Sequence, residues 1–515
     1  RGGLQYFNSI HIPDMDATTI LWVIGAYFAL LFVISWWTGR DADEQTFFSA
    51  NRDSPWYLVA FGMIGVTLSG VTYISVPGQV GPGNWAYLQF VFGNFIGFLF
   101  IARVLLPLYY RLNLTSIYGY LEQRFGISSY QTGAMFFLLS RVIGASFRLY
   151  LVAIVLQVAI FDELGVPFAA TVAIAITLIY IYTFRGGIKT VIWTDTLQTF
   201  FLLLGAGIAV YMIANQLDWG VGEVVSQISA SDYSKTFFWD VLPANFFGKQ
   251  FFSGVAITIV MVGLDQDMMQ KNLTCRNLGE AQTNMYSFST VFVLANIFFL
   301  GLGALLFLYG HEMGIIQEVT DGGYQLMIKN IETGMFEAGK TDELFTVISL
   351  DYLGGAAAIF FILGVIAAAY SSADSALTAL TTSVCVDFLR FEKRSDEARK
   401  NRQRKLVHLS LSGVLFLLIL LFKWIGDDSV VTMLFKASGY TYGPLLGLFL
   451  VGMYLPKAQP RDRLVPFVCV LAPILTYVIQ AFSPELTGYT FGFEILLLNA
   501  ALTIGGLLLL PRERA

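Results

Sequence analysis

The segment AAAYSSADSAL places three hydroxyls and one carboxylate within five residues of a long apolar run. Residues three and four apart share one face of a helix, and Asp374 lies beside that face. The residues on the face are Ala368, Ser371, Ser372 and Ser375. Hydroxyl and carboxylate oxygens are hard ligands that suit a small hard cation. The segment therefore predicts a cation site, and we expect its remaining ligands to be unpaired carbonyls of a broken helix at residues 65–68.

Other ionisable groups also lie within apolar runs, where their burial is expensive and indicates function. They are Arg141, Arg148, Asp195, Asp265, Asp267 and Lys436. Helical rise places Asp195 and Asp374 both roughly 15–20 Å from the ends of their helices, so they can meet at one level. A cation, a proton or an arginine must then offset their charges. We expect Arg141 to have a structural role, whereas Arg148 is either structural or the counter-charge of an anionic solute.

The whole chain is rich in apolar segments that could position these groups. Its 515 residues are 56% hydrophobic and 13% charged, and the mean hydropathy is +0.66. Continuous apolar runs of about 20 residues, the length that a helix needs to cross roughly 30 Å of hydrocarbon, recur along the sequence. These runs lack the alternation of a membrane β-barrel. We predict an all-α polytopic membrane protein with about 13 transmembrane helices.

Basic residues gather on every second loop between the runs. These loops hold Arg40, Arg52, Arg111, Arg124, Arg185, Lys189, Lys271, Arg276, the run RFEKRSDEARKNRQRK, Lys457, Arg461 and Arg463. By the positive-inside rule the basic loops are cytoplasmic. The sequence therefore predicts a multi-pass protein of the cell inner (plasma) membrane, with its N-terminus outside and its C-terminus in the cytoplasm.

Two runs, FGMIGVTLSGVTYISVPG and FFSGVAITIVMVGLDQDMM, contain several glycines and lie five spans apart. This spacing favours an inverted repeat of five plus five helices, each opened by a discontinuous helix. The alternative is that the glycines only let helices approach closely. The predicted organisation is an N-terminal extracellular segment and extra helix (1–54), a first five-helix repeat (55–215), an extracellular loop (216–248), a second five-helix repeat (249–456) and two C-terminal helices (457–515).

Five motifs together resemble those of the sodium/solute symporter family. They are SPWYLVAFGMIGVTLSGVTYISVPG, LTSIYGYLEQRFG, RGGIKTVIWTDTLQ, GLDQDMMQK and AAAYSSADSAL. The resemblance runs over nearly the whole chain. It implies a LeuT-type core of ten helices, formed here by the second to eleventh spans, in which the first and sixth core helices are discontinuous.

The resemblance also implies bound sodium. The family's main sodium site maps onto the carbonyls of Gly65, Leu68 and Ala368 and the hydroxyls of Ser371 and Ser372. A second site, where relatives have one, maps onto Asp195, Ser371, Ser375 and the position of Asp374. Relatives with that site usually have a serine where Asp374 stands. One or two Na⁺ ions are therefore expected, and the added carboxylate either strengthens cation binding or lets a proton replace the ion.

The solute pocket departs from the sugar and sialic acid patterns of the family. The residues that mark those patterns fall at Val91, Gly144, Asp267 and Thr283. Arg148, one helical turn from Gly144, could substitute for the arginine of the sialic acid carriers. The expected solute contacts are Thr67, Ser69, Thr72, Asn94, Arg148, Asp265 and Gln266.

These patterns predict a sodium-coupled symporter that imports a small polar or anionic organic solute by alternating access. A proton-coupled carrier of the same fold and a solute sensor that does not transport are the alternatives. No catalytic constellation is visible, so an enzyme is not expected. The expected partners are the solute and the lipid bilayer, without nucleic acid, and the protein is expected to be a monomer.

Overall fold

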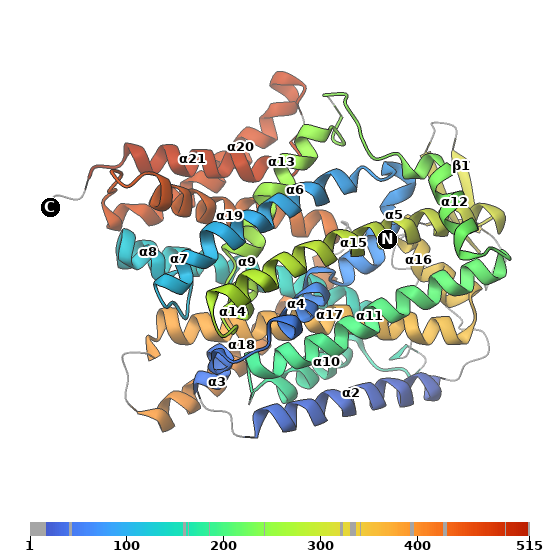
Figure 1. The fold of residues 1–515 in the computed structure, drawn as a ribbon, viewed down its shortest axis with the longest axis horizontal. Helices are drawn as coiled ribbons and strands as arrows, with labels where there is room; N and C mark the ends of the chain where they lie inside the picture. Colours follow the sequence, from blue (N-terminus) through green and yellow to red (C-terminus); the bar gives the residue numbers. More distant parts are fainter. Residues whose placement is uncertain are drawn as a thin grey trace.

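The computed structural model describes residues 17–40, 44–157, 161–162, 164–184, 186–241, 243–319, 323–329, 336–339, 341–391, 396–425, 430–489 and 491–512. Most of the predicted N-terminal segment and the side chain of Lys436 lie outside this description. In Figure 1 most of the long helices run across the view, with α7, α8 and α14 toward one end and α12, α16 and β1 at the other.

The described helices follow one another along the whole chain. They are α2 (Ala17–Gly39), α3 (Glu44–Ser49), α4 (Trp56–Thr67), α5 (Gly70–Gly83), α6 (Tyr87–Phe100), α7 (Leu106–Arg111), α8 (Gly119–Arg124), α9 (Ile127–Leu156), α10 (Phe168–Thr183), α11 (Ile188–Gln216), α12 (Val221–Ala230), α13 (Phe247–Thr258), α14 (Gln266–Asn272), α15 (Leu278–Glu312), α16 (Leu344–Val347), α17 (Gly355–Ser383), α18 (Glu397–Ile425), α19 (Val430–Tyr454), α20 (Val465–Thr487) and α21 (Ile495–Leu509). Short π-helical turns extend α6, α13 and α17 at their C-terminal ends; they are η3 (Ile101–Leu105), η6 (Ile259–Gly263) and η9 (Val384–Phe388).

The helices confirm the all-α polytopic prediction. Eight described helices are long and apolar enough to cross a membrane, and ten spans result when each of two bent pairs is taken as one. Two shorter apolar helices, α10 and α21, and the 25-residue α19 accompany them. Each predicted run thus coincides with a helix or a bent pair.

The two bent pairs lie where the sequence predicts discontinuous helices. The first pair, α4 and α5, bends by 56° around Leu68 and Ser69. The second pair, α13 with η6 and then α14, bends by 69° around Leu264 and Asp265. A helix that stops inside the membrane leaves backbone carbonyls without helical partners, so each break offers polar groups at depth.

The glycines near these breaks serve close packing as well. A Cβ on Gly65 would lie 2.3 Å from the Thr199 hydroxyl of α11, and one on Gly254 would lie 2.2 Å from the Phe90 carbonyl of α6. Such contacts bring backbones together as small residues do in membrane helix interfaces. The alternative that the glycines only serve close packing is therefore wrong, since broken helices and tight packing occur in the same segments.

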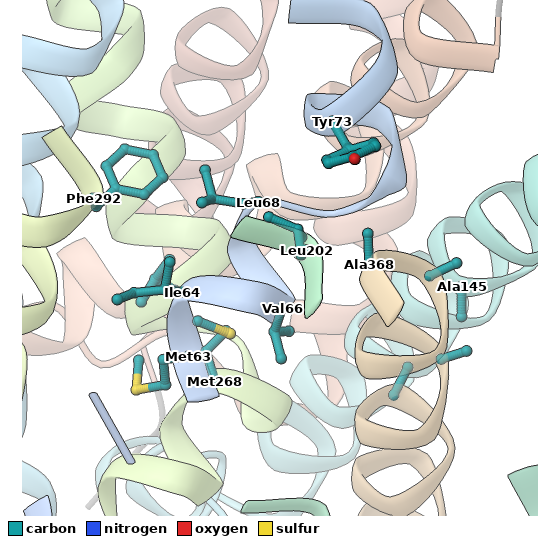
Figure 2. Close-up of a cluster of buried hydrophobic side chains, with 14 of the residues drawn as sticks. Met63, Ile64, Val66, Leu68, Tyr73, Ala145, Leu202, Met268, Phe292 and Ala368 are labelled. Atoms are coloured by element: carbon teal, nitrogen blue, oxygen red, sulfur yellow. The ribbon is translucent and has the colours of Figure 1, made fainter. Parts of the chain in front are cut away.

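The most enclosed helix is α17, which carries the serine-rich segment. In the most apolar 18-residue stretch of α17 and η9, 83% of the residues are buried. The corresponding share is 28% for α2 and 22% for both α18 and α20. α17 packs against α4, α9 and α11. Figure 2 shows this buried cluster, including Val66 and Leu68 near the end of α4 and Ala368 on α17.

A small antiparallel sheet lies in the long connection between α15 and α16, where the sequence predicts only a loop. Its strands are β1 (Ile316–Val319), β2 (Gly323–Lys329) and β3 (Phe336–Gly339), in that spatial order. The strand β1 contacts α15, and β2 contacts α5. The sheet thus covers one end of the helix bundle, and the chain has a minor β element that hydropathy does not reveal.

Tyrosine hydroxyls tie the second broken helix to its neighbours. Tyr109 donates to the Gly263 carbonyl (2.9 Å), and Tyr118 donates to the Leu264 carbonyl (3.1 Å). At the far end of α14, Tyr110 donates to the Asn272 carbonyl (2.9 Å). The backbone groups freed by this break are therefore satisfied by side chains from α7 and the loop and helix that follow it.

Candidate functional site

Ser371 and Ser372 of α17 lie beside the first break. The Ser372 hydroxyl donates to the Val66 carbonyl of α4 over 3.1 Å, across 306 residues of sequence. The Ser371 hydroxyl is fully buried and has no hydrogen-bond partner among the described residues. A buried polar atom without a partner is costly, so this hydroxyl oxygen is available for an additional ligand.

The helix α11 fixes the position of α4 at this break. The Gly65 amide donates to the Thr199 hydroxyl (3.0 Å), and that hydroxyl donates to the Asp195 carbonyl (2.8 Å). Val66, Leu68 and both serines are buried. The site therefore combines hydroxyl oxygens with the carbonyl end of a helix in an enclosed place, a set of groups that suits a small hard cation such as Na⁺.

The predicted second cation site is built differently. The side chain of Asp195 is fully buried, and its Oδ2 accepts from the Lys271 ammonium at 2.6 Å. Its Oδ1 has no hydrogen-bond partner among the described residues. The charge that must offset Asp195 is therefore a lysine of the protein itself.

Asp374 has neutral partners in its hydrogen bonds. Its Oδ2 accepts from the Tyr182 hydroxyl of α10 at 2.7 Å, and its Oδ1 accepts from the Ser375 amide at 2.5 Å. The Ser375 hydroxyl donates instead to Asp267 of α14. Ser375 and Asp374 thus lie in the predicted place, but their polar atoms already have partners within the protein.

A network of ion pairs and hydrogen bonds fills the second break. Arg141 of α9 pairs with Asp267 and lies 3.3 Å from Asp265 Oδ1. The other oxygen of Asp265 accepts from the Tyr442 hydroxyl at 2.5 Å. Asp265 also caps α14, because its Oδ1 accepts from the amides of Asp267 (3.0 Å) and Met268 (3.4 Å). The structural role expected for Arg141 agrees with these contacts.

One residue of the second break contradicts the sequence analysis. Lys271 is counted there as a basic residue of a cytoplasmic loop, but α14 continues through it and leaves it 1% exposed. The error arises because the positive-inside rule assigns any lysine near the end of a span to a loop. Asp195 and Asp374 in facing helices were the signal that a buried cation was needed.

Five of the seven predicted solute contacts line one pocket, with a cavity volume of about 110 Å³, next to the first break. They are Thr67, Ser69, Thr72, Asn94 and Arg148. The other two do not line it: Asp265 caps α14, and Gln266 joins its amide to the Thr115 carbonyl (2.9 Å) and the Ile117 amide (2.9 Å). Their side chains brace the broken helix instead.

Arg148 is the charged side chain available to a ligand in this pocket. It is 9% exposed, and its Nε and Nη1 have no hydrogen-bond partner in the part of the chain that is described. Asn296 also lines the pocket, with its Oδ1 unpartnered, and the sequence analysis did not select it. An asparagine in the middle of an apolar helix was the signal that could have identified it.

The walls of the pocket are mostly apolar. Its aromatic and aliphatic residues are Val66, Tyr87, Phe90, Phe98, Ile257, Met261, Val262, Met268 and Phe292. Arg141 reaches the same wall but is paired with Asp267. The pocket therefore has a guanidinium, hydroxyls and amides at a few places on an otherwise apolar surface, as ligand sites commonly do.

The end of α4 connects the pocket to the candidate cation site. Val66 and Thr67 lie at the end of α4 and line the pocket, while the Val66 carbonyl accepts from Ser372 of the cation site. No cluster of three or more His, Cys, Asp or Glu side chains that could hold a metal ion occurs in the described residues.

The sequence is similar to several curated transporters. It is 26% identical over 469 residues to the sodium/sialic acid symporter NanT of Aliivibrio fischeri, covering 88% of this chain and 84% of the relative. It is 23% identical to the sodium/sialic acid symporter SiaT of Proteus mirabilis (91% and 90%). It is also 27% identical to the sodium-dependent multivitamin transporter of Oryctolagus cuniculus (88% and 70%).

Solved structures and a family model extend this similarity. A substrate-bound, outward-open Na⁺-coupled sialic acid symporter matches with a TM-score of 0.77 and 20% identity over 95% of this chain and 96% of that one. The transporter Mhp1 matches with a TM-score of 0.54 and 15% identity over 91% and 93%. These likenesses agree with the LeuT-type arrangement of broken helices. The family model described as the sodium:solute symporter family matches residues 47–464. This chain therefore belongs to the sodium:solute symporter family, whose members are transporters and not enzymes.

Proposed function

We propose that this protein imports a small organic anion by alternating access and couples the import to sodium bound between α4 and α17. The observation that carries the proposal is the unpartnered, buried hydroxyl of Ser371 next to the end of α4. The proposed ligands are the hydroxyls of Ser371 and Ser372 and the carbonyls of Gly65, Leu68 and Ala368. Sodium binding joins the two helices, and because Val66 and Thr67 also line the pocket, it favours a conformation competent to bind solute.

The proposed solute carries a carboxylate. Arg148 presents unpartnered guanidinium nitrogens in the pocket, and the described lining contains no acidic side chain. Thr67, Ser69, Thr72 and Asn94 supply hydrogen bonds, and the aromatic walls suit an apolar or mixed body. Two of the similar proteins are named for sialic acid, which supports an acidic solute class for this chain without assigning that molecule to it.

The remaining parts of the proposal concern organisation. We place the protein in the cell inner (plasma) membrane as a monomer, with its N-terminus outside and its C-terminus in the cytoplasm. Residues 55–215 and 249–456 form the two five-helix repeats, residues 1–54 and 457–515 lie outside them, and 216–248 connects them outside the cell. The proposal requires one sodium site, between α4 and α17. Asp195, Asp374 and Ser375 are residues onto which the family's second site maps.

The experiment is thermal unfolding of the detergent-purified protein at fixed ionic strength in sodium, potassium or choline chloride. Sodium alone is expected to raise the midpoint, because a ligand that binds only the folded state stabilises it. Ser371→Ala abolishes that rise. The matched control is Ser289→Ala, which removes another buried serine hydroxyl that donates within its own helix to the Tyr286 carbonyl (2.8 Å).

Carboxylic acids are then screened in saturating sodium. A ligand that fits the pocket raises the midpoint further, and Arg148→Gln removes this second rise while the sodium effect stays. Indifference to sodium in the unsubstituted protein contradicts the sodium proposal.

Proton coupling is the second candidate, and Asp374 favours it. This carboxylate is fully buried, and it accepts hydrogen bonds from a tyrosine hydroxyl and a backbone amide. A proton on Asp374 would remove a buried charge as effectively as a cation would. A midpoint that changes with pH but not with sodium, and loses this dependence in Asp374→Asn, supports this candidate instead.

A further inference from the structure

The Lys271 ammonium lies among three carboxylates of the transport core. It contacts Asp195 directly at 2.6 Å, and it lies four residues from Asp267 on the same helix. Ser375 links the other two acids, because its amide donates to Asp374 and its hydroxyl donates to Asp267. Lys271 and all three acids are buried to 99% or more. Lys271 thus pairs with the acid of α11, while Arg141 pairs with Asp267 of α14.

This ammonium occupies the place where the family resemblance puts a second sodium. Of the expected ligands, Asp195 has one oxygen bound to Lys271, Ser375 donates to Asp267, and Asp374 is bound by Tyr182 and an amide. The atoms there that lack hydrogen-bond partners among the described residues are Asp195 Oδ1 and Ser371 Oγ. With Asp195 paired to Lys271 and Ser375 bound to Asp267, the ammonium repels a second cation at this place.

The position of Lys271 is fixed by the residues on either side of it. Gln270 donates to the Phe48 carbonyl (2.7 Å) and to the Thr382 hydroxyl (3.0 Å). The Asn272 side-chain oxygen accepts from Asn284 (2.7 Å). These bonds hold α14 against α3, α17 and α15. The ammonium is therefore placed by the fold and does not depend on the ion pair alone.

We infer that Lys271 is a tethered cation that takes the place of a second sodium, so that this transporter couples one sodium ion to each solute. The inference rests on the proposed sodium-coupled function and adds the ion count. A fixed ammonium stabilises the acids in every state in which α14 stays in place, whereas a second sodium would bind and leave in each cycle. Lys271 is thus a residue that determines the stoichiometry of coupling.

The test measures sodium dependence in proteoliposomes loaded with the unsubstituted protein or with Lys271→Met, which keeps the length of the side chain and removes its charge. The transported solute is the carboxylate with the largest stabilisation in the screen above. Solute uptake against sodium concentration gives a Hill coefficient, and the reversal potential gives the number of sodium ions per solute. The unsubstituted protein is expected to show a Hill coefficient of about 1 and a ratio of about one.

Lys271→Met is expected to admit a second sodium, with the Hill coefficient and the ratio both moving toward two. Asp195→Asn in the Lys271→Met background returns them toward one. Asp195→Asn alone keeps its sodium dependence, because Asp195 binds Lys271 and not sodium. Lys271→Arg keeps a fixed charge and keeps the ratio at one, which also covers the case in which Lys271→Met does not fold.

Four results overturn the inference. Two sodium ions per solute in the unsubstituted protein remove it while leaving sodium coupling intact. Loss of sodium dependence in Asp195→Asn alone shows that this acid is a sodium ligand. If Lys271→Met transports solute more slowly but keeps the ratio of sodium ions to solute unchanged, the ion pair between Lys271 and Asp195 is purely structural. Uptake that is independent of sodium in the unsubstituted protein removes both this inference and the proposed function.

Discussion

The two broken helices of this protein differ in how their polar groups are satisfied. The break between α4 and α5 contacts the Ser372 hydroxyl, and the nearby Ser371 hydroxyl lacks a partner among the described residues. The break between η6 and α14 is filled with charges, and Arg141 pairs there with both Asp265 and Asp267. The two helix breaks can therefore have opposite roles.

The comparison teaches which break can respond to a ligand. A network whose charges are already matched gains little from another ion, and it would lose pairs if an ion displaced one of them. A neutral site with a missing partner gains when an ion arrives and loses when the ion leaves. The first break is thus suited to reversible binding, whereas the second is suited to holding α14 in place.

The substitution with the largest expected effect on unfolding free energy tests whether the second break is a permanent structural element. Arg141→Met leaves Asp265 and Asp267 buried without their cation, and it is expected to cost about 3–5 kcal/mol of unfolding free energy. Chemical unfolding in detergent measures this loss.

The control for that change is Arg276→Met, near the same break. Arg276 pairs with Asp53 over 2.8 Å, but the two side chains are 55% and 73% exposed. Exposed pairs are screened by solvent, so the free energy of unfolding is expected to stay nearly unchanged. Equal losses in the two variants would contradict the distinction between a buried network and a surface pair.

A smaller effect tests the packing of the first break. Gly65→Ala places a Cβ against the Thr199 hydroxyl, which itself accepts from the Gly65 amide. This overpacking is expected to cost about 1–3 kcal/mol and to weaken sodium binding, because it moves α4 relative to α17. Thermal unfolding with and without sodium measures both.

Thr199→Ala in the Gly65→Ala background removes the nearest clashing atom and is expected to restore part of the stability. The restoration is incomplete, because the Thr199 Cβ remains 3.2 Å from the new methyl position. A double variant no better than the single one would show that the cost does not come from this contact.

The smallest effect separates the two adjacent serines. In the absence of sodium, Ser372→Ala loses its hydrogen bond to the Val66 carbonyl and is expected to cost about 0.5–1.5 kcal/mol. Ser371→Ala removes a hydroxyl without a partner, so it is expected to leave the unfolding free energy nearly unchanged. Both variants are expected to bind sodium more weakly in a sodium titration. A larger loss for Ser371→Ala without sodium would mean that its hydroxyl has a structural role.

Much of the fold follows from local patterns in the sequence. Runs of apolar residues predict the spans, and glycines in two runs that lie five spans apart predict the two discontinuous helices, which break at Leu68 and Leu264. The spacing of Ser371 and Ser372 predicts a polar face on α17, and the structure places that face beside α4. These features depend on residues that are close together in the sequence, so a single sequence is enough to predict them.

The partners of the charged residues could not be predicted in the same way. Arg141 and Asp267 are 126 residues apart, and Lys271 and Asp195 are 76 apart. Many pairings of the intramembrane charges satisfy electroneutrality, and only the arrangement of helices selects one. The capping role of Asp265 was likewise hidden, because it depends on where α14 begins.

The tyrosines that hold the second broken helix have a consequence for the speed of its movement. Tyr109, Tyr110 and Tyr118 donate neutral hydrogen bonds to backbone carbonyls. Water that enters this end of the bundle can replace such bonds one by one at little net loss. The charges of the break remain paired within the protein meanwhile. Separation of α14 from α7 at this end therefore exchanges neutral hydrogen bonds for bonds to water and does not separate ion pairs. Its barrier is set mainly by how readily water enters.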